Sequence, residues 1–143
     1  MMADDSKAVW QLRNHPDVAK WMVNDTFIPF ENHARFVENL KSDSSKDYFI
    51  IKDNEGNIIG SVNAIYLDNH LAERGIYVSP QFQGRGHAFK TLMEFYEELK
   101  SNAIRGVITR VKTDNLASNN LEHKLGATLT ERRDGYNFYM VAL

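Results

Sequence analysis

A glycine-rich segment from Gly75 to Ala88 stands between an expected strand and an expected helix. Gly84 and Gly86 let the backbone approach a bound group closely, and the small Ala88 keeps the start of the helix clear. The first N–H groups of a helix have no partner within it, and they lie at the positive end of its dipole. The order of these residues therefore predicts a site for a phosphorylated ligand.

Three phosphate-binding motifs share this logic and have to be distinguished. A P-loop needs a glycine directly before its Lys-Thr pair, whereas here Phe89 precedes Lys90-Thr91. A dinucleotide fingerprint also needs a glycine at that place, together with a strand-helix-strand unit and a distal acid, and neither is found. The pattern that remains is Q-x-x-G-x-G/A, which Gln81, Gly84 and Gly86 satisfy.

With this motif the sequence resembles the GCN5-related N-acetyltransferases (GNAT superfamily). A second segment, residues 115–127, is similar to the asparagine-led helix of that family, which ends in a Lys-Leu-Gly turn. The resemblance covers roughly residues 48–143. It implies that acetyl-CoA is the co-substrate, with its pyrophosphate on the glycine loop and its pantetheine arm beside the preceding strand, which splays from its neighbour. The residues expected to bind acetyl-CoA are Ile76, Tyr77, Val78, Gln83, Gly84, Arg85, Gly86, His87, Ala88, Asn115 and Ser118.

The first forty residues carry further motifs, which are Arg13-Asn14-His15-Pro16-Asp17, Trp21-Met22, Ile28, His33, Phe36 and Leu40. They look like the N-terminal half of the enzymes that acetylate the 4-amino group of a UDP-linked dideoxy sugar in the pseudaminic-acid pathway. That resemblance implies a small-molecule amine as acceptor. Arg13 would contact the nucleotide diphosphate, where a guanidinium suits bidentate recognition. Met22, Phe36 and Tyr77 would line the sugar pocket. Peptide, protein and antibiotic amine acetyltransferases share parts of the pattern and stay open as alternatives.

The reaction that the resemblance implies is direct attack of a neutral amine on a thioester carbonyl, without an acyl-enzyme. Such an enzyme has to remove a proton from the ammonium, stabilise the developing oxyanion and help the thiolate to leave. Ser61 corresponds to a strand serine that positions a water as proton acceptor in the sugar-acetylating relatives. Glu73 lies near the place where many members have a general base. The N–H groups of residues 76–78 are expected to polarise the carbonyl.

Glu122 departs from the family pattern. It stands where the family commonly has a tyrosine that protonates the leaving thiolate. An ionised glutamate cannot do so unless burial raises its pKa. Because only Leu121 and Leu125 flank it with apolar surface, we expect Glu122 to be too exposed for that. The acid is therefore unassigned, and a catalytically weakened CoA-binding domain remains an alternative function.

The elements that position these residues follow from the hydrophobic pattern. Helices are expected from about Asp4–Ser6, over residues 18–23 and 31–41, after Gly86, and over residues 115–125. Strands are expected over residues 48–52, 58–67, 71–78, 106–112, 127–132 and 136–142. This order predicts a mixed α/β (α+β) domain with one central, mostly antiparallel sheet flanked by helices. On the resemblance this is the GNAT fold, with its usual opening strand short or absent.

The composition sets the outer limits. The chain has 143 residues, 43% of them apolar and 25% charged, as in one compact domain over residues 1–143. Residues 1–45 would supply the acceptor side and residues 48–143 the acetyl-CoA side. A net charge of −2 gives no reason to expect nucleic acid. The absence of cysteine excludes disulfides and thiol nucleophiles, and we expect no metal.

The sequence and the family resemblance also suggest where the protein is located and whether it forms a dimer. The longest apolar runs are too short to cross a bilayer, and the first residues lack the basic and apolar regions of a secretory signal. We therefore expect a cytoplasmic protein without a membrane partner. Because dimers are common in the family, the resemblance makes a homodimer a hypothesis for this chain.

Overall fold

A computed structural model describes residues 5–22, 24 and 26–143. Three helices come first, namely α1 (Ser6–Arg13), α2 (Pro16–Ala19) and α3 (Phe30–Leu40). A three-stranded meander follows, formed by β1 (Lys46–Lys52), β2 (Ile58–Tyr66) and β3 (Leu71–Val78). The 3-10 turn η2 (Pro80–Phe82) leads into α4 (His87–Ser101). The chain ends with β4 (Gly106–Lys112), α5 (Leu116–Lys124), β5 (Thr128–Arg133) and β6 (Tyr136–Ala142).

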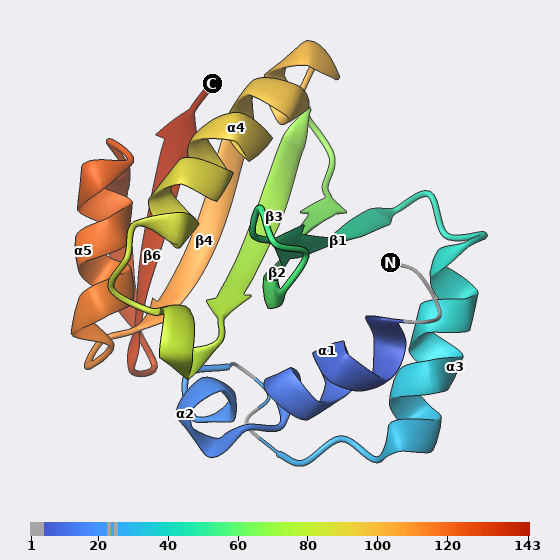
Figure 1. The fold of residues 1–143 in the computed structure, drawn as a ribbon. Coiled ribbons are helices and arrows are strands. Elements are labelled where there is room, and N and C mark those ends of the chain that lie inside the picture. The colour runs from blue at the N-terminus through green and yellow to red at the C-terminus, as the bar shows by residue number, and fades with distance from the viewer. Residues whose placement is uncertain (1–4, 23, 25) are drawn as a thin grey trace.

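The six strands form one sheet in the order β1-β2-β3-β4-β6-β5. Only β3 and β4 run parallel, and every other neighbouring pair is antiparallel. The prediction of a mixed, mostly antiparallel sheet is confirmed. Figure 1 shows α4 lying along the face of the sheet with α5 beside β6. α1 and α3 lie near β1 and β2, whereas α2 lies near η2.

The parallel pair β3–β4 is short. It consists of Leu71 opposite Gly106, Ala72 opposite Val107, and Glu73 opposite Ile108. Beyond these pairs both strands continue, β3 to Val78 and β4 to Lys112, but they are no longer joined. The splay that the family resemblance implied is present, and it leaves two strand edges without a partner strand.

The core lies between the sheet and α4. Leu92, Phe95, Tyr96 and Leu99 are buried at the i, i+3, i+4, i+7 spacing of one helix face. Met93 lies outside this face and is 48% exposed, whereas Phe95 is buried. Buried residues on the sheet complete the cluster, among them Ile59, Val62, Ala64, Ala72 and Val107.

The N-terminal helices differ from the prediction in extent. α2 ends at Ala19, whereas residues 18–23 were expected to be helical, and Val23 and Asp4 lie outside the described residues. Phe30 at the start of α3 is 41% exposed, with its ring 5.3 Å from that of Trp10. The buried residues of α3 are His33 and Val37. In the described part of the chain no strand precedes α3.

Candidate active site

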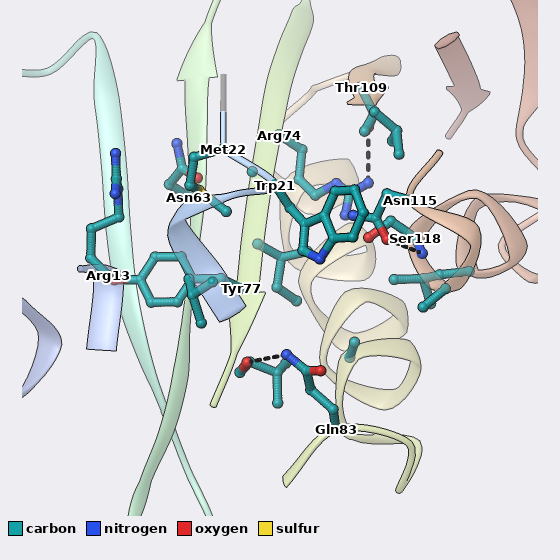
Figure 2. Close-up of a pocket in the computed structure, with 18 of the residues that line it drawn as sticks. Arg13, Trp21, Met22, Asn63, Arg74, Tyr77, Gln83, Thr109, Asn115 and Ser118 are labelled. Carbon is teal, nitrogen blue, oxygen red and sulfur yellow. Dashed lines mark hydrogen bonds between the residues drawn. The ribbon is translucent and has the colours of Figure 1, made fainter. Parts of the chain in front are cut away.

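A cavity of about 830 Å³ opens at the β3–β4 gap and continues between the sheet and the N-terminal helices (Figure 2). All the residues predicted to bind acetyl-CoA line it except Arg85. Arg13, Met22, Phe36 and Tyr77, predicted for the acceptor, also line it, as does Glu73. Ser61 lies outside the lining. The structure thus brings residues from both halves of the chain into one space.

The glycine loop has the backbone geometry of an anion site. Gly84 has φ +76° and Gly86 has φ +82°, in the left-handed region that glycine adopts without strain. Apart from the glycine itself and its neighbours in the chain, no described heavy atom lies within 4 Å of the place where a Cβ would stand at either glycine. Gly86 is the N-cap of α4 and has no side chain to satisfy the first N–H groups. These groups and the open space beside them suit a phosphate.

The loop is tied to β3. The Gln83 side-chain amide donates a hydrogen bond to the Val78 carbonyl, 2.9 Å away (Figure 2). The Ser79 N–H donates across the sheet to the Ile59 carbonyl at 2.7 Å. Because N–H groups of an antiparallel strand point alternately to its two sides, those of Ile76 and Val78 point into the gap. An extended ligand arm in the gap would find donors there.

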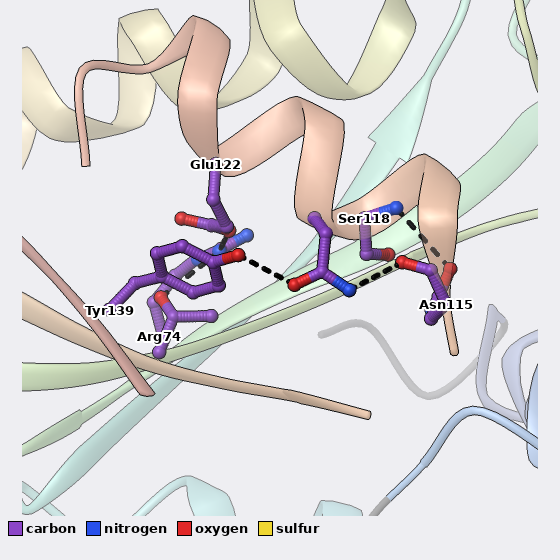
Figure 3. Close-up of polar contacts among 7 residues, drawn as sticks. Arg74, Asn115, Ser118, Glu122 and Tyr139 are labelled. Carbon is purple, nitrogen blue, oxygen red and sulfur yellow. Dashed lines mark hydrogen bonds and ion pairs between the residues drawn. The ribbon is translucent and has the colours of Figure 1, made fainter. Parts of the chain in front are cut away.

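α5 is fixed at the mouth of the gap by asparagines (Figure 3). The Asn115 side chain caps α5 by accepting from the Ser118 N–H at 3.3 Å. Asn119 donates to the Asn115 carbonyl at 2.8 Å, and its own oxygen accepts from the Tyr139 hydroxyl at 2.6 Å and from Asn137 at 2.8 Å. The start of α5 is therefore anchored to β6.

Glu122 is buried, contrary to expectation. Its side chain is 1% exposed and pairs with Arg74, which is 2% exposed (Figure 3). Arg74 also donates to the Thr109 hydroxyl at 3.0 Å. Burial raises the pKa of Glu122, and the charge and hydrogen bond of Arg74 oppose that rise. The second carboxylate oxygen of Glu122 and Nε of Arg74 have no hydrogen-bond partner among the described residues.

Tyr77 lies between the predicted acceptor residues. Burial raises its pKa to about 12, against the opposing effects of a hydrogen bond with Ser61 and the charge of Arg13. Ser61 is opposite Tyr77 on β2 and donates its hydroxyl proton to the Phe49 carbonyl at 3.1 Å. Glu73 and Tyr77 have the same parity on β3, so they lie on one face of the sheet. Ser61 therefore reaches the cavity only by way of Tyr77.

The far wall of the cavity is aromatic. The rings of Phe36 and Tyr48 meet edge to face at 4.9 Å, and Tyr48 hydrogen-bonds to Asn63. Asn63 in turn lies over Gly75, where an added Cβ would come within 2.4 Å of its side-chain oxygen. Sequence reasoning missed Tyr48, Asn63 and the buried Arg74. Strand parity was the available signal. Arg74 has the same parity on β3 as Ala72 and Ile76, so the three side chains share the face that packs against α4 and α5.

Polar contacts tie the N-terminal helices to one another and to the sheet. The Asn14 side chain donates to the Ile28 carbonyl at 2.9 Å and accepts from the Ile28 N–H at 3.0 Å. Lys112 on β4 donates to the Lys20 carbonyl at 2.6 Å. The N-terminal segment that covers the acceptor end of the cavity is therefore fixed at Lys112 on β4 and, within itself, between Asn14 and Ile28.

The sequence profile described as "Acetyltransferase (GNAT) domain" matches residues 1–128. The chain belongs to the GNAT acetyltransferases. The acetyltransferase PseH of Campylobacter jejuni (strain 81-176) is 31% identical over 108 residues, which are 74% of this chain and 68% of that protein.

Solved structures of GNAT enzymes share the fold. Spermidine N-acetyltransferase from Vibrio cholerae, in complex with CoA and spermine, superimposes with a TM-score of 0.88 at 16% identity, over 99% of this chain and 92% of that one. The acetyltransferase yncA of Salmonella typhimurium, with its cofactor acetyl-CoA, gives a TM-score of 0.81 at 21% identity, over 99% and 90%.

This GNAT enzyme is an acetyl-CoA-dependent N-acetyltransferase. Its own residues fit the co-substrate, since the glycine loop offers N–H groups to the pyrophosphate and the gap offers strand edges to the pantetheine arm. Within the described ranges, no three His, Asp or Glu side chains gather to hold a metal ion. None of the helices found there is long and apolar enough to cross a membrane.

Proposed function

We propose that this enzyme transfers the acetyl group of acetyl-CoA to the primary amine of a UDP-linked 4-amino-4,6-dideoxy sugar. The observation that carries the proposal is that Arg13 lines the same cavity as the β3–β4 gap. A cation at the acceptor end suits a substrate with a diphosphate. The similarity to PseH and the motifs of the first forty residues support the same class of acceptor.

The acceptor chamber has the mixture of surfaces that such a substrate needs. Arg13 donates to the Asn24 carbonyl, which fixes its guanidinium near the wall formed by Tyr77 (Figure 2). Trp21 and Met22 lie between that wall and the gap. Aromatic and apolar faces pack against sugar and base rings, while the guanidinium matches phosphate oxygens.

The chemistry is assigned to groups of this chain. Glu73 lines the cavity on the acceptor face of β3 and would accept the ammonium proton, directly or through a water. Ser61, the other predicted catalytic residue, would act through its contact with Tyr77. The N–H groups of Ile76 and Val78 would stabilise negative charge on the carbonyl oxygen. We propose the cytoplasm as the compartment, which is consistent with a sequence that has no cysteine and so forms no disulfide.

The test compares acceptors and one pair of variants. Wild-type enzyme is assayed by thiol release with a UDP-4-amino sugar, spermidine and an N-terminal peptide. Arg13→Ala should lower kcat/KM for the UDP sugar by roughly 30-fold or more, the worth of a desolvated charged contact, with CoA affinity unchanged. Lys7→Ala, at an exposed position of the same helix, is the control and should have no effect. Turnover of spermidine or peptide with none of the UDP sugar would contradict the proposal.

A further inference from the structure

We propose that Arg74 stabilises the CoA thiolate as it leaves, and that Glu122 is a positioning residue that holds the guanidinium for this task. The inference rests on acetyl transfer from acetyl-CoA. It does not depend on which amine accepts the acetyl group. It assigns a group to the part of the reaction for which the sequence offered none.

The position of Arg74 follows from the sheet. β3 and β4 are paired up to Glu73 and Ile108, so the gap is closed there. Arg74 and Thr109 are the next residue of each strand and form the closed end. A ligand arm that starts at the glycine loop and runs along the gap reaches this end with its reacting group. Arg74, Thr109 and Glu122 all line the cavity at that point.

The Arg74 guanidinium is held in place by hydrogen bonds, but not all of its N–H donors have a partner among the described residues. One nitrogen of Arg74 donates both to Thr109 and to Glu122, while Nε has no partner among the described residues. A guanidinium has five N–H donors in a rigid plane, so donors remain for a ligand. With only 2% of the side chain exposed, its charge acts in a poorly solvated site, where fixed donors stabilise an anion most.

The step balances without a proton donor on the enzyme. The amine nitrogen bonds to the carbonyl carbon, the C–S bond breaks, and its electron pair passes to sulfur. The base on the acceptor side takes one proton when the ammonium becomes a neutral amine. The nitrogen that has bonded to carbon then loses a second proton to solvent, which leaves a neutral amide. The thiolate is held beside Arg74 and takes up a proton from solvent on release.

The titratable groups around the ion pair are not suited to donate that proton. Tyr96 from α4 faces the pair but does not line the cavity, and burial raises the pKa of its hydroxyl to about 12, which makes it a weaker acid. His123 follows Glu122 on α5 and is exposed to solvent. Glu122 itself faces Arg74 and compensates its charge.

The experiment measures the thiol of bound CoA and needs no acceptor. Affinities for CoA and for desulfo-CoA, which lacks the thiol, are measured by calorimetry from pH 6.5 to 9.5. Ultraviolet absorbance of the thiolate is followed in the CoA complex. If Arg74 favours the thiolate, the bound thiol has a lower pKa than the free thiol. CoA affinity then rises with pH between the two pKa values, by about tenfold for each unit of difference. Desulfo-CoA shows no such rise.

The variant for this test removes both charges. Arg74→Met with Glu122→Leu replaces a buried ion pair by apolar side chains, an exchange that folded proteins usually tolerate. It should abolish the lowering of the bound thiol pKa and reduce kcat by roughly 10²- to 10³-fold, with desulfo-CoA affinity retained. Wild-type enzyme that binds CoA and desulfo-CoA with the same pH dependence overturns the proposal, whether or not the variant folds.

A second outcome also overturns it. If kcat of the wild type falls as pH rises, and Glu122→Gln removes that fall, then Glu122 donates a proton to sulfur and Arg74 does not act alone. Failure of the UDP sugar as acceptor would leave the CoA titration unchanged, so the two proposals fail separately.

Discussion

The two ends of the cavity are built in different ways. At the proposed acetyl-CoA end the binding groups would be backbone N–H groups, presented by two glycines with positive φ and by a strand edge that has no partner strand. At the proposed acceptor end they are side chains such as Arg13 and Phe36, carried by short helices, of which α1 is tied by Asn14 to the segment that precedes α3.

This difference explains why the acetyl-CoA end can be recognised from a sequence motif, whereas the acceptor cannot be identified in the same way. Backbone groups are positioned by glycine spacing and by the order of elements, which survive many substitutions. Side chains on α1, α2 and α3 can change one at a time without disturbing the sheet, so the acceptor can change while the acetyl donor stays the same. Substitutions at one end should therefore leave the other end unaffected.

The largest effect is expected at the acceptor face, from Glu73→Gln. Loss of the proton acceptor should lower kcat by roughly 10²- to 10⁴-fold, with CoA affinity unchanged. Ser61→Ala should cost less, because the Ser61 hydroxyl donates to the Phe49 carbonyl and reaches the cavity through Tyr77. Steady-state rates at saturating substrates decide this. A larger loss in Ser61→Ala would make the serine the essential group.

The next effect tests the backbone end. Gly84→Asp should weaken CoA binding by roughly 10- to 100-fold, because a carboxylate would stand in the open space where the pyrophosphate is expected. Gly56→Asp is a matched control, since Gly56 has φ +83° and equally open surroundings but lies in the β1–β2 turn. Both variants should lose similar stability. Equal CoA affinities by calorimetry would refute the loop as the pyrophosphate site.

The smallest effect is expected at the contact that holds the N-terminal wall. Asn14→Asp replaces the donor that faces the Ile28 carbonyl by an acceptor, at a cost of about 1 to 3 kcal/mol. The acceptor KM should rise several-fold, and CoA affinity should stay the same. Asn54→Asp, in an exposed turn, controls for the added charge. A change in CoA affinity in Asn14→Asp would show that the two ends of the cavity are coupled.

Much of the fold was predictable because its signals are local. β3 and β4 have the predicted bounds, since Asn69-His70 and Ser79-Pro80 flank the first strand and Gly106 and Lys112 mark the ends of the second. The N-terminal helices were less predictable. α2 is a single turn whose length depends on what it packs against, and Phe30 is exposed because its ring packs on Trp10 at the surface.

The candidate site shows the same division. The glycine loop could be found from its motif, but the burial of Glu122 could not. α5 has few apolar residues beside Glu122, and tertiary contacts bury the side chain instead. Glu122 pairs with Arg74 on β3, and Asn119, one turn earlier on α5, binds Tyr139 and so holds the helix against β6. For the same reason a tyrosine at position 122 would leave Arg74 buried without its counter-ion.

The short parallel ladder between β3 and β4 has a consequence for how the domain opens. β1, β2 and β3 form one antiparallel unit and β4, β5 and β6 another, and three residue pairs join them. Amide hydrogens at the three β3–β4 pairs should exchange with solvent when the two units separate. The free energy of this opening should be lower than the free energy of opening within either unit. A ligand that bridges both strand edges raises that free energy by mass action. Bound acetyl-CoA would thus join the two halves of the sheet, and the enzyme would be least rigid when no acetyl-CoA is bound.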